Sequence, residues 1–319
     1  MKHLVIYFPA LNEEATIAQV IEDTKLKFEG VSKLTHLVVD DGSRDRTAAI
    51  AKKSGATVIS HKENRGVGAA FQTAIKFTLQ IKADVLVSYD ADNQFNARDI
   101  KNIILPIIND TADLVLGCRF ANGKPEHMSV LKYRGNKVVN TIISTISKTK
   151  IEDASCGFRS YSQEALLNLN LHGNFTYTHE TILDLIDKGL SVIQIPIGVT
   201  YFKERKSRVA SSIYKYAIRT SRIIFKSFKD YAPFYFFGRL ALFVLVIGFL
   251  FGGFVIWHWF STGFISPYKS IGIVGLVLVG MALLLFILAL IADMLGRLRR
   301  NQERILYQLK KQTSENFIK

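Results

Sequence analysis

The chain has 319 residues, a net charge of +14 and a hydrophobic content of 49%. Residues 1–202 carry 23 lysines and arginines against 22 acidic residues, so the basic excess lies in the last third, beside long apolar runs. This distribution argues against nucleic acid as a partner and for an anionic membrane surface. Cys118 and Cys156 are the only two cysteines, which argues against a disulfide framework and favours a reducing compartment.

The first two thirds of the chain alternate short apolar runs with helical patterns. This alternation predicts an α/β domain over residues 1–202, built on a mostly parallel sheet. Because Pro9 and Asn12 interrupt the first apolar run, it is too short for a secretory signal, and we expect the domain to stay in the cytosol. Strands are expected at 3–8, 36–39, 57–60, 85–88 and 114–117, and helices at 14–28, 44–54, 66–80 and 97–109.

Polar side chains follow the first two expected strands. Asn12 and Ser43 are suited to cap the helices that come next, and Gly42 permits a tight turn. A carboxylate such as Asp41 could also accept hydrogen bonds from a nucleobase or a ribose. Because ligands of parallel sheets bind beyond the carboxyl ends of the strands, these residues are expected near a binding site.

The segment Tyr89-Asp-Ala-Asp-Asn-Gln94 ends the fourth expected strand. Its spacing lets Asp90 and Asp92 face one pocket. Paired carboxylate oxygens suit Mg²⁺ or Mn²⁺, which keeps further positions for the phosphates of a substrate. Such a metal would neutralise a departing diphosphate.

Other motifs carry weaker signals. The loop Asn64-Arg-Gly-Val-Gly-Ala69 lacks the full pattern of a phosphate loop and is interpreted as a helix start. Arg119, Arg134 and Arg159 offer guanidinium groups that could bind phosphates, although a surface salt bridge is the commoner role of a single arginine. Glu180 could act as a general base or simply favour the start of a helix.

Two uncharged apolar runs, 240–257 and 270–292, are long enough to approach or cross a bilayer. The link between them carries Gly263, Pro267 and one lysine, whereas arginines and lysines crowd the outer flanks, so a hairpin with both termini in the cytosol is expected. Residues 211–231 read as a basic amphipathic helix at the membrane interface. The predicted organisation is therefore a catalytic domain (1–202), a basic loop with the interfacial helix (203–235), two transmembrane helices (236–295) and a basic cytosolic tail (296–319) that could mediate a homo-oligomer.

The motifs occur together in a recognisable order: Pro-Ala-Leu-Asn-Glu-Glu, Asp-Asp-Gly-Ser-Arg-Asp, Asp-Ala-Asp-Asn-Gln, Gly-Cys-Arg and Cys-Gly-Phe-Arg. In this order the chain resembles family 2 glycosyltransferases, in particular the branch of dolichol-phosphate mannose synthase and bacterial polyprenyl-phosphate glycosyltransferases. The resemblance covers about the first two thirds of the chain. It implies a GT-A (Rossmann-like) fold, a nucleotide diphosphate sugar as donor, polyprenyl phosphate as acceptor, and an inverting displacement in an integral protein of the cell membrane or, in a eukaryote, of the endoplasmic reticulum.

The resemblance also implies roles for particular residues. The nucleoside would be held by Pro9, Leu11, Glu13 and Asp41, with Asp90 beside it, and the metal and diphosphate by Asp90, Asp92 and Gln94. Arg119 and Arg134 would bind donor phosphates or the acceptor, so that Asp92, Arg119, Arg134 and Arg205 form the catalytic set. Arg205 matches the position that meets the lipid phosphate, but the loop Arg205-Lys-Ser-Arg208 lacks the usual glycine, and Lys203, Lys206 or Arg208 could take its place.

Two other functions remain open at this stage. A processive polysaccharide synthase would typically carry Gln-x-x-Arg-Trp and more spans, and neither appears here. A non-catalytic membrane scaffold that only binds nucleotide sugars would not need the intact Asp-x-Asp pair. The sugar and the nucleobase cannot be read from the sequence.

Overall fold

The computed structural model describes residues 1–171, 177–201 and 233–316. The chain divides into two compact units: one comprises Met1–Tyr216 together with Ile305–Lys319, and the other is Ala217–Arg304. The predicted interfacial helix and Arg205 lie in the segment 202–232, outside the described residues. The predicted domain boundaries stay predictions.

The first unit is built on a seven-stranded mixed sheet with the strand order β3-β2-β1-β4-β6-β5-β7. Only β6 runs antiparallel to its neighbours β4 and β5, while every other pair is parallel. The predicted α/β fold with a mostly parallel sheet is thereby confirmed. The strands are β1 (Lys2–Ala10), β2 (Val31–Asp40), β3 (Thr57–Ser60), β4 (Val85–Ser88), β5 (Leu114–Cys118), β6 (Arg159–Ser162) and β7 (Val192–Pro196).

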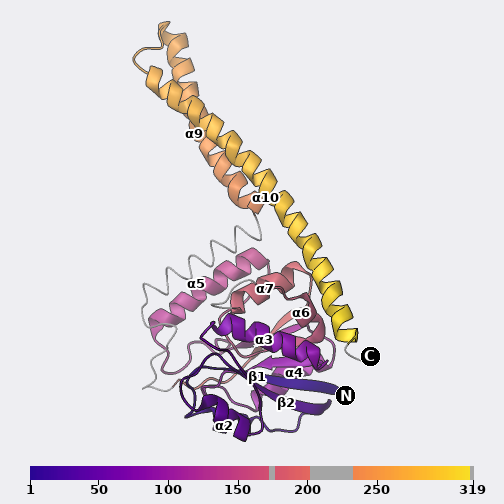
Figure 1. The fold of residues 1–319 in the computed structure, drawn as a ribbon. Coiled ribbons are helices and arrows are strands. Elements are labelled where there is room, and N and C mark those ends of the chain that lie inside the picture. The colour runs from indigo at the N-terminus through magenta and orange to yellow at the C-terminus, as the bar shows by residue number, and fades with distance from the viewer. Residues whose placement is uncertain (172–176, 202–232, 317–319) are drawn as a thin grey trace. The chain divides into compact units, whose positions relative to one another are not determined.

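Helices cover both faces of this sheet. Alternate side chains of β1, such as Leu4, Ile6 and Phe8, pack with buried residues of α1, α2 and α4 in one core. The opposite face carries Tyr7, whose ring lies 6.0 Å from that of Phe71 on α3, and α3 contacts α6 while α5 contacts α7. Figure 1 shows α3, α6 and α7 together on one side of the sheet and α2 on the other. These helices are α1 (Ile17–Asp23), α2 (Thr47–Lys53), α3 (Val67–Gln80), α4 (Asp99–Ile108), α5 (Val130–Ser147), α6 (Gln163–Asn168) and α7 (Thr178–Asp187).

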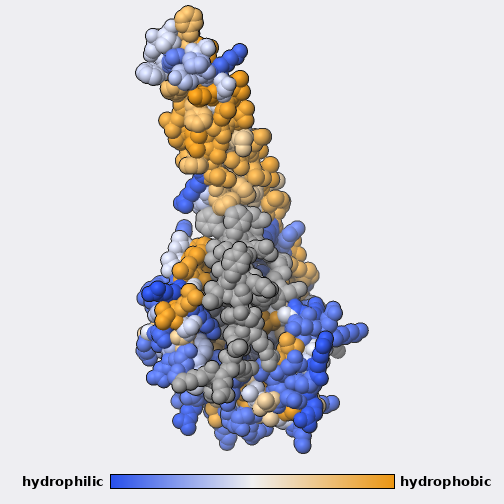
Figure 2. Space-filling model, turned by 90° about the vertical axis from the view of Figure 1, so that its left-hand side faces the viewer, coloured by the Kyte–Doolittle hydropathy of each residue, from blue (hydrophilic) through white to orange (hydrophobic). Residues whose placement is uncertain are grey.

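The second unit contains two long helices, α9 (Pro233–Thr262) and the first part of α10 (Lys269–Asn316). Both are long and apolar enough to cross a membrane. Their surface is hydrophobic over most of this unit, with polar atoms at the hairpin end (Figure 2). The helices pack with backbones nearly touching, because a Cβ atom at Gly275 would lie 2.9 Å from the backbone nitrogen of Gly252. This unit is consistent with the predicted membrane hairpin.

Candidate active site

The loops that follow β1 and β2 are tied to each other by hydrogen bonds. The Asn12 N–H donates to Ser43 Oγ and the Arg44 N–H donates to Asn12 Oδ1, both at 2.9 Å. The Glu13 N–H donates to Thr47 Oγ1, also at 2.9 Å. The two loops therefore form one rigid rim at the carboxyl ends of neighbouring strands, where a ligand of a parallel sheet is expected.

These bonds correct the predicted capping roles. Asn12 adopts a left-handed conformation with φ of 53° and precedes α1 by several residues, and the residue at the N-cap of α1 is Thr16. Arg46, and not Ser43, is at the N-cap of α2. The prediction for Gly42 is confirmed, because its φ is +79° and a Cβ atom there would lie 2.7 Å from the carbonyl carbon of Glu63.

Asp41 is buried beneath this rim. Its Oδ1 accepts the Arg65 N–H at 3.0 Å and lies 2.7 Å from His61 Nδ1, while its Oδ2 accepts the Gly66 N–H at 2.7 Å. The Asp41 carboxylate thus accepts hydrogen bonds from the backbone amides just before α3 begins. The prediction that the loop Asn64–Ala69 is a helix start is confirmed. Asp41 is bound within the protein on these sides, and its predicted contact with a nucleoside stays a prediction.

The Asp90–Gln94 loop after β4 joins the same rim. Thr16 Oγ1 donates to the carbonyl of Ala91 at 2.7 Å, and the Gln94 N–H donates to Asp92 Oδ1 at 3.2 Å. Asp90 lies against Gly157, where an added Cβ atom would come within 3.0 Å of Asp90 Oδ1. The glycine of the Cys-Gly-Phe-Arg motif, which the sequence explains equally well as a turn, therefore makes room for this carboxylate.

Asp41 and Asp90 both act electrostatically on the buried hydroxyl of Tyr7. Burial raises the pKa of the Tyr7 hydroxyl well above its usual value, and Tyr177, Asp90 and Asp41 raise it further. Both carboxylates are thus within electrostatic reach of one phenol, although they follow different strands. Negative charge gathers at this edge of the sheet, as a cation site requires.

The residues fit a divalent metal that completes its coordination with substrate. The loop offers two carboxylates and the Gln94 amide, all hard oxygen ligands of the kind that Mg²⁺ and Mn²⁺ prefer. Among the described residues no group of three or more His, Cys, Asp and Glu side chains could hold a metal alone. An ion bound here would complete its coordination with other oxygens, such as those of water or of a bound phosphate.

Arg119 forms the opposite side of the site and is already paired. Its Nε and Nη2 donate to the two carboxylate oxygens of Asp153 at 2.7 and 2.8 Å, and its Nη1 donates to the Tyr201 hydroxyl at 3.2 Å. Asp153 is fully buried. The pairing holds the guanidinium in one orientation, and its predicted role in binding phosphate stays a prediction.

Lys132 is a cation that sequence reasoning missed. Its ammonium lies 5.1 Å from the centroid of the Tyr201 ring. Burial lowers the pKa of Lys132 and the charge of Arg119 lowers it further, whereas the charge of Asp92 raises it. Lys132 therefore lies within electrostatic reach of both the cationic and the carboxylate side, yet no motif marks it in the sequence.

The remaining arginines have different surroundings. Arg134 lies on α5 and is exposed to solvent. Arg159 is fully buried, and its guanidinium donates to the carbonyls of Cys156, Thr178 and Ala154 at 2.7, 2.7 and 2.8 Å. Arg159 thus makes neither a surface salt bridge nor a phosphate site, and it fastens the start of α7 to the loop before β6.

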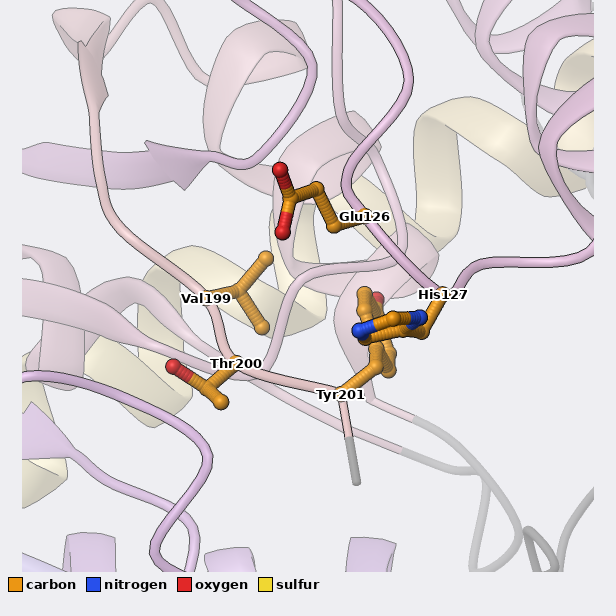
Figure 3. A pocket seen from close by; sticks show the side chains of 5 residues that line it. All are labelled: Glu126, His127, Val199, Thr200 and Tyr201. Carbon is orange, nitrogen blue, oxygen red and sulfur yellow. The ribbon is translucent and has the colours of Figure 1, made fainter. Parts of the chain in front are cut away.

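A pocket of about 240 Å³ is lined by Glu126, His127, Val199, Thr200 and Tyr201 (Figure 3). Its wall is joined to the Asp90–Gln94 loop and the residue after it, because the Thr200 N–H donates to the carbonyl of Gln94 at 2.9 Å and Val199 pairs with Phe95. A carboxylate, an imidazole, a hydroxyl and a phenol ring thus line a pocket whose wall is hydrogen-bonded to Gln94.

Residues 5–169 match the profile of the family described as Glycosyl transferase family 2, and the chain belongs to this family. It is 30% identical, over 65% of its own length and 89% of the relative's, to the UDP-N-acetylglucosamine–dolichyl-phosphate N-acetylglucosaminyltransferase of Methanococcus voltae. It is also 30% identical, over 61% of its length and 81% of the relative's, to the dolichyl-phosphate hexose transferase of Haloferax volcanii.

Among solved structures, the fold is similar to glucosyl-3-phosphoglycerate synthase from Mycobacterium tuberculosis, crystallised with Mn²⁺, UDP and glucosyl-3-phosphoglycerate. The TM-score is 0.56 at 20% identity, covering 73% of this chain and 80% of that one. This likeness confirms the expected GT-A fold. The protein is thus a glycosyltransferase of family 2 with relatives that act on dolichyl phosphate.

Proposed function

We propose that this protein transfers a single sugar from a nucleotide diphosphate sugar to polyprenyl phosphate, with inversion, at the cytosolic face of a membrane. The observation that carries the proposal is the Asp90–Asp92 loop at the carboxyl end of β4, with Lys132 within electrostatic reach of both Asp92 and Arg119, in a chain that also has two helices able to span a bilayer. Both named relatives use dolichyl phosphate as acceptor. The excess of basic residues beside the apolar helices favours an anionic membrane surface as the place of reaction.

The proposed reaction is one displacement. A phosphate oxygen of the lipid forms a bond to the anomeric carbon while the bond from that carbon to the donor diphosphate breaks, and the nucleoside diphosphate leaves. Because the attack comes from the side opposite the leaving group, the anomeric configuration inverts. A lipid phosphate is already ionised near neutral pH, so no strong general base is required, and Glu180 need not supply one.

The residues of the chain bind and orient the reactants. Asp90, Asp92 and Gln94 would hold Mg²⁺ or Mn²⁺, which would supply positive charge to the leaving diphosphate. Lys132 and the paired guanidinium of Arg119 present positive charge on the opposite side, where an anionic acceptor would be attracted. Catalysis would then come mainly from position and charge. Arg134 and Arg205 stay predicted partners of phosphate groups.

The test uses membranes that contain the full-length protein, polyprenyl phosphate and a panel of nucleotide sugars. We expect a lipid-linked monosaccharide that mass spectrometry identifies after lipid extraction, and we expect its formation to stop when the metal is chelated. A polymer would instead indicate a processive synthase. Binding of nucleotide sugar without any product would indicate a scaffold, and either result would overturn the proposal.

A further inference from the structure

The C-terminal end of α10 binds to the helix α6 within the first unit (Figure 1). The Tyr307 hydroxyl donates to Glu164 Oε2 at 3.0 Å. One turn further on, Lys310 Nζ donates to the carbonyl of Leu169 at 2.6 Å, to Asn170 Oδ1 at 2.9 Å and to the carbonyl of Leu167 at 3.4 Å. Two residues of one helical face thus contact both ends of α6.

These bonds satisfy polar groups at the C-terminal end of α6. The last carbonyls of a helix have no partners within it, and the negative end of the helix favours a cation. Lys310 donates hydrogen bonds to the carbonyls of Leu167 and Leu169, and Lys188 donates to the carbonyl of Asn168 at 2.6 Å. Two ammonium groups therefore satisfy three successive carbonyls where α6 ends. Lys310 is half-buried in this contact.

The segment that docks is continuous with an apolar helix. Helix α10 runs without a break from Lys269 to Asn316, and its hydrophobic part belongs to the second unit. The chain leaves the first unit after Tyr216 and returns to it at Ile305. The second unit is accordingly joined to the first at both of its ends, and at the C-terminal end the joining helix also binds α6.

We propose that residues 305–316 are a docking segment that fastens the catalytic unit to the membrane hairpin, and that this second attachment is needed for transfer to a membrane-held acceptor. The surface that receives the segment is the face of α6 with Glu164 and the carbonyls at its end. Its occupant is the C-terminal segment of the same chain. The part of the inference that concerns the acceptor rests on the proposed function.

The docking surface on α6 is connected to the candidate active site through other elements of the first unit. Helix α6 follows β6, which pairs with β4, and Asp90 comes two residues after β4 ends. Beyond α6 the chain reaches Tyr177, whose ring stacks on Phe71 at 4.0 Å and whose hydroxyl lies 2.8 Å from Ser88 Oγ. The docked segment therefore binds α6, which contacts both β6 and α3 and lies in the sequence between β6 and Tyr177.

The contact itself is tested by cross-linking in the full-length protein. In a Tyr307→Cys, Glu164→Cys variant, a short bismaleimide should join the two positions within one chain, as mass spectrometry of the linked peptides would show. The native Cys118 and Cys156 are buried, and a Gln308→Cys, Glu164→Cys variant is the matched control, since Gln308 is exposed on the same helix. No link, a link equally strong in the control, or a link only between two chains would overturn the docking.

The functional part is tested with Lys310→Met and, as a control that removes the same charge from an exposed position nearby, Arg304→Met. We expect Lys310→Met to raise the KM for polyprenyl phosphate about tenfold, because the docked helix loses its main anchor, while the affinity for the nucleotide stays unchanged. Equal kinetics in the two variants would overturn this part. If even the unaltered protein transferred no sugar, the proposed function and this kinetic claim would both fail, while the cross-link would still decide the docking.

Discussion

The carboxylate side and the cationic side of the candidate site are held by different kinds of contact. On the carboxylate side, bonds between a backbone group and a neutral side chain tie the loops together, as in the bonds from Asn12 to the Ser43–Arg44 turn and from Thr16 to Ala91. On the cationic side, Arg119 is oriented by a buried side chain, Asp153. We therefore expect substitutions on the first side to change activity and substitutions on the second to change stability.

The largest effect is expected from Asp92→Asn. The amide keeps the shape of the side chain and an oxygen for the Gln94 N–H, but it removes a negative charge from the proposed metal site. Transfer should fall on the order of a thousandfold, with little change in the melting temperature, because the asparagine Oδ1 can still accept the Gln94 N–H and the bonds from Thr16 and Thr200 to the loop remain. Sugar transfer and Mn²⁺ titration measure the two quantities. Undiminished transfer by this variant in the presence of a chelator would contradict the metal role.

On the cationic side, Asp153→Asn should destabilise the fold. It leaves the buried guanidinium of Arg119 without its counter-charge, and breaking a buried pair costs about 3–5 kcal/mol. Denaturant titration of the full-length protein in detergent measures the free energy of unfolding. Lys150→Met is the matched control, because Lys150 pairs with Glu152 at the surface with 84% of its side chain exposed, and such pairs contribute about 1 kcal/mol or less. An equal loss of unfolding free energy in both variants would show that the buried Arg119–Asp153 pair stabilises the fold no more than the exposed pair does.

Much of the scaffold could be predicted because hydrophobic patterns are local. The strands at 57–60 and 85–88 appear at the predicted residues, and β1, β2 and β5 appear with extended ends. The helix expected at 14–28 is shorter, Ile17–Asp23. It begins later than expected, because Glu13 and Glu14 give their N–H groups to Thr47 and Asp45 on the neighbouring loop. The sequence of one element cannot reveal a competing partner that lies about 30 residues away.

At the candidate site, too, the sequence does not reveal partners that are distant along the chain. Asp90, Asp92 and Arg119 stand in recognisable motifs, and the structure puts them at one edge of the sheet. Lys132 and Asp153 do not, since their importance comes from Tyr201 and Arg119, which are distant in the sequence. Strand β6 was also missed. It inserts antiparallel between β4 and β5, and it contains Arg159 and two serines that hide its buried character.

Gly157→Ala would show how tightly the carboxylate side is packed. The new methyl group would lie 3.0 Å from Asp90 Oδ1 and 3.2 Å from Oδ2, so the carboxylate would have to move. We expect the affinity for Mn²⁺ to fall about 10- to 100-fold, as for other changes that misplace a metal ligand. Gly135→Ala is the control, because a Cβ atom there meets nothing within 4 Å. If both alanine variants bound Mn²⁺ equally, the close approach of Asp90 to Gly157 would not matter for the metal.

The smallest expected effect concerns His179, which lies behind the cationic side. Burial and the charge of Arg159 lower its pKa to about 4, although Asp153 opposes them. The folded protein therefore resists protonation that the unfolded chain accepts near pH 6.5. The stabilisation is complete above that pH and is lost as the pH falls toward 4, so the free energy of unfolding should drop by about 2 kcal/mol between roughly pH 7.5 and pH 5.

The control is His179→Gln, because glutamine does not titrate. This variant can have a lower free energy of unfolding at every pH, but its plot of that free energy against pH should lack the drop caused by His179. Parallel pH profiles of the two proteins would mean that His179 takes up a proton as readily when folded as when unfolded.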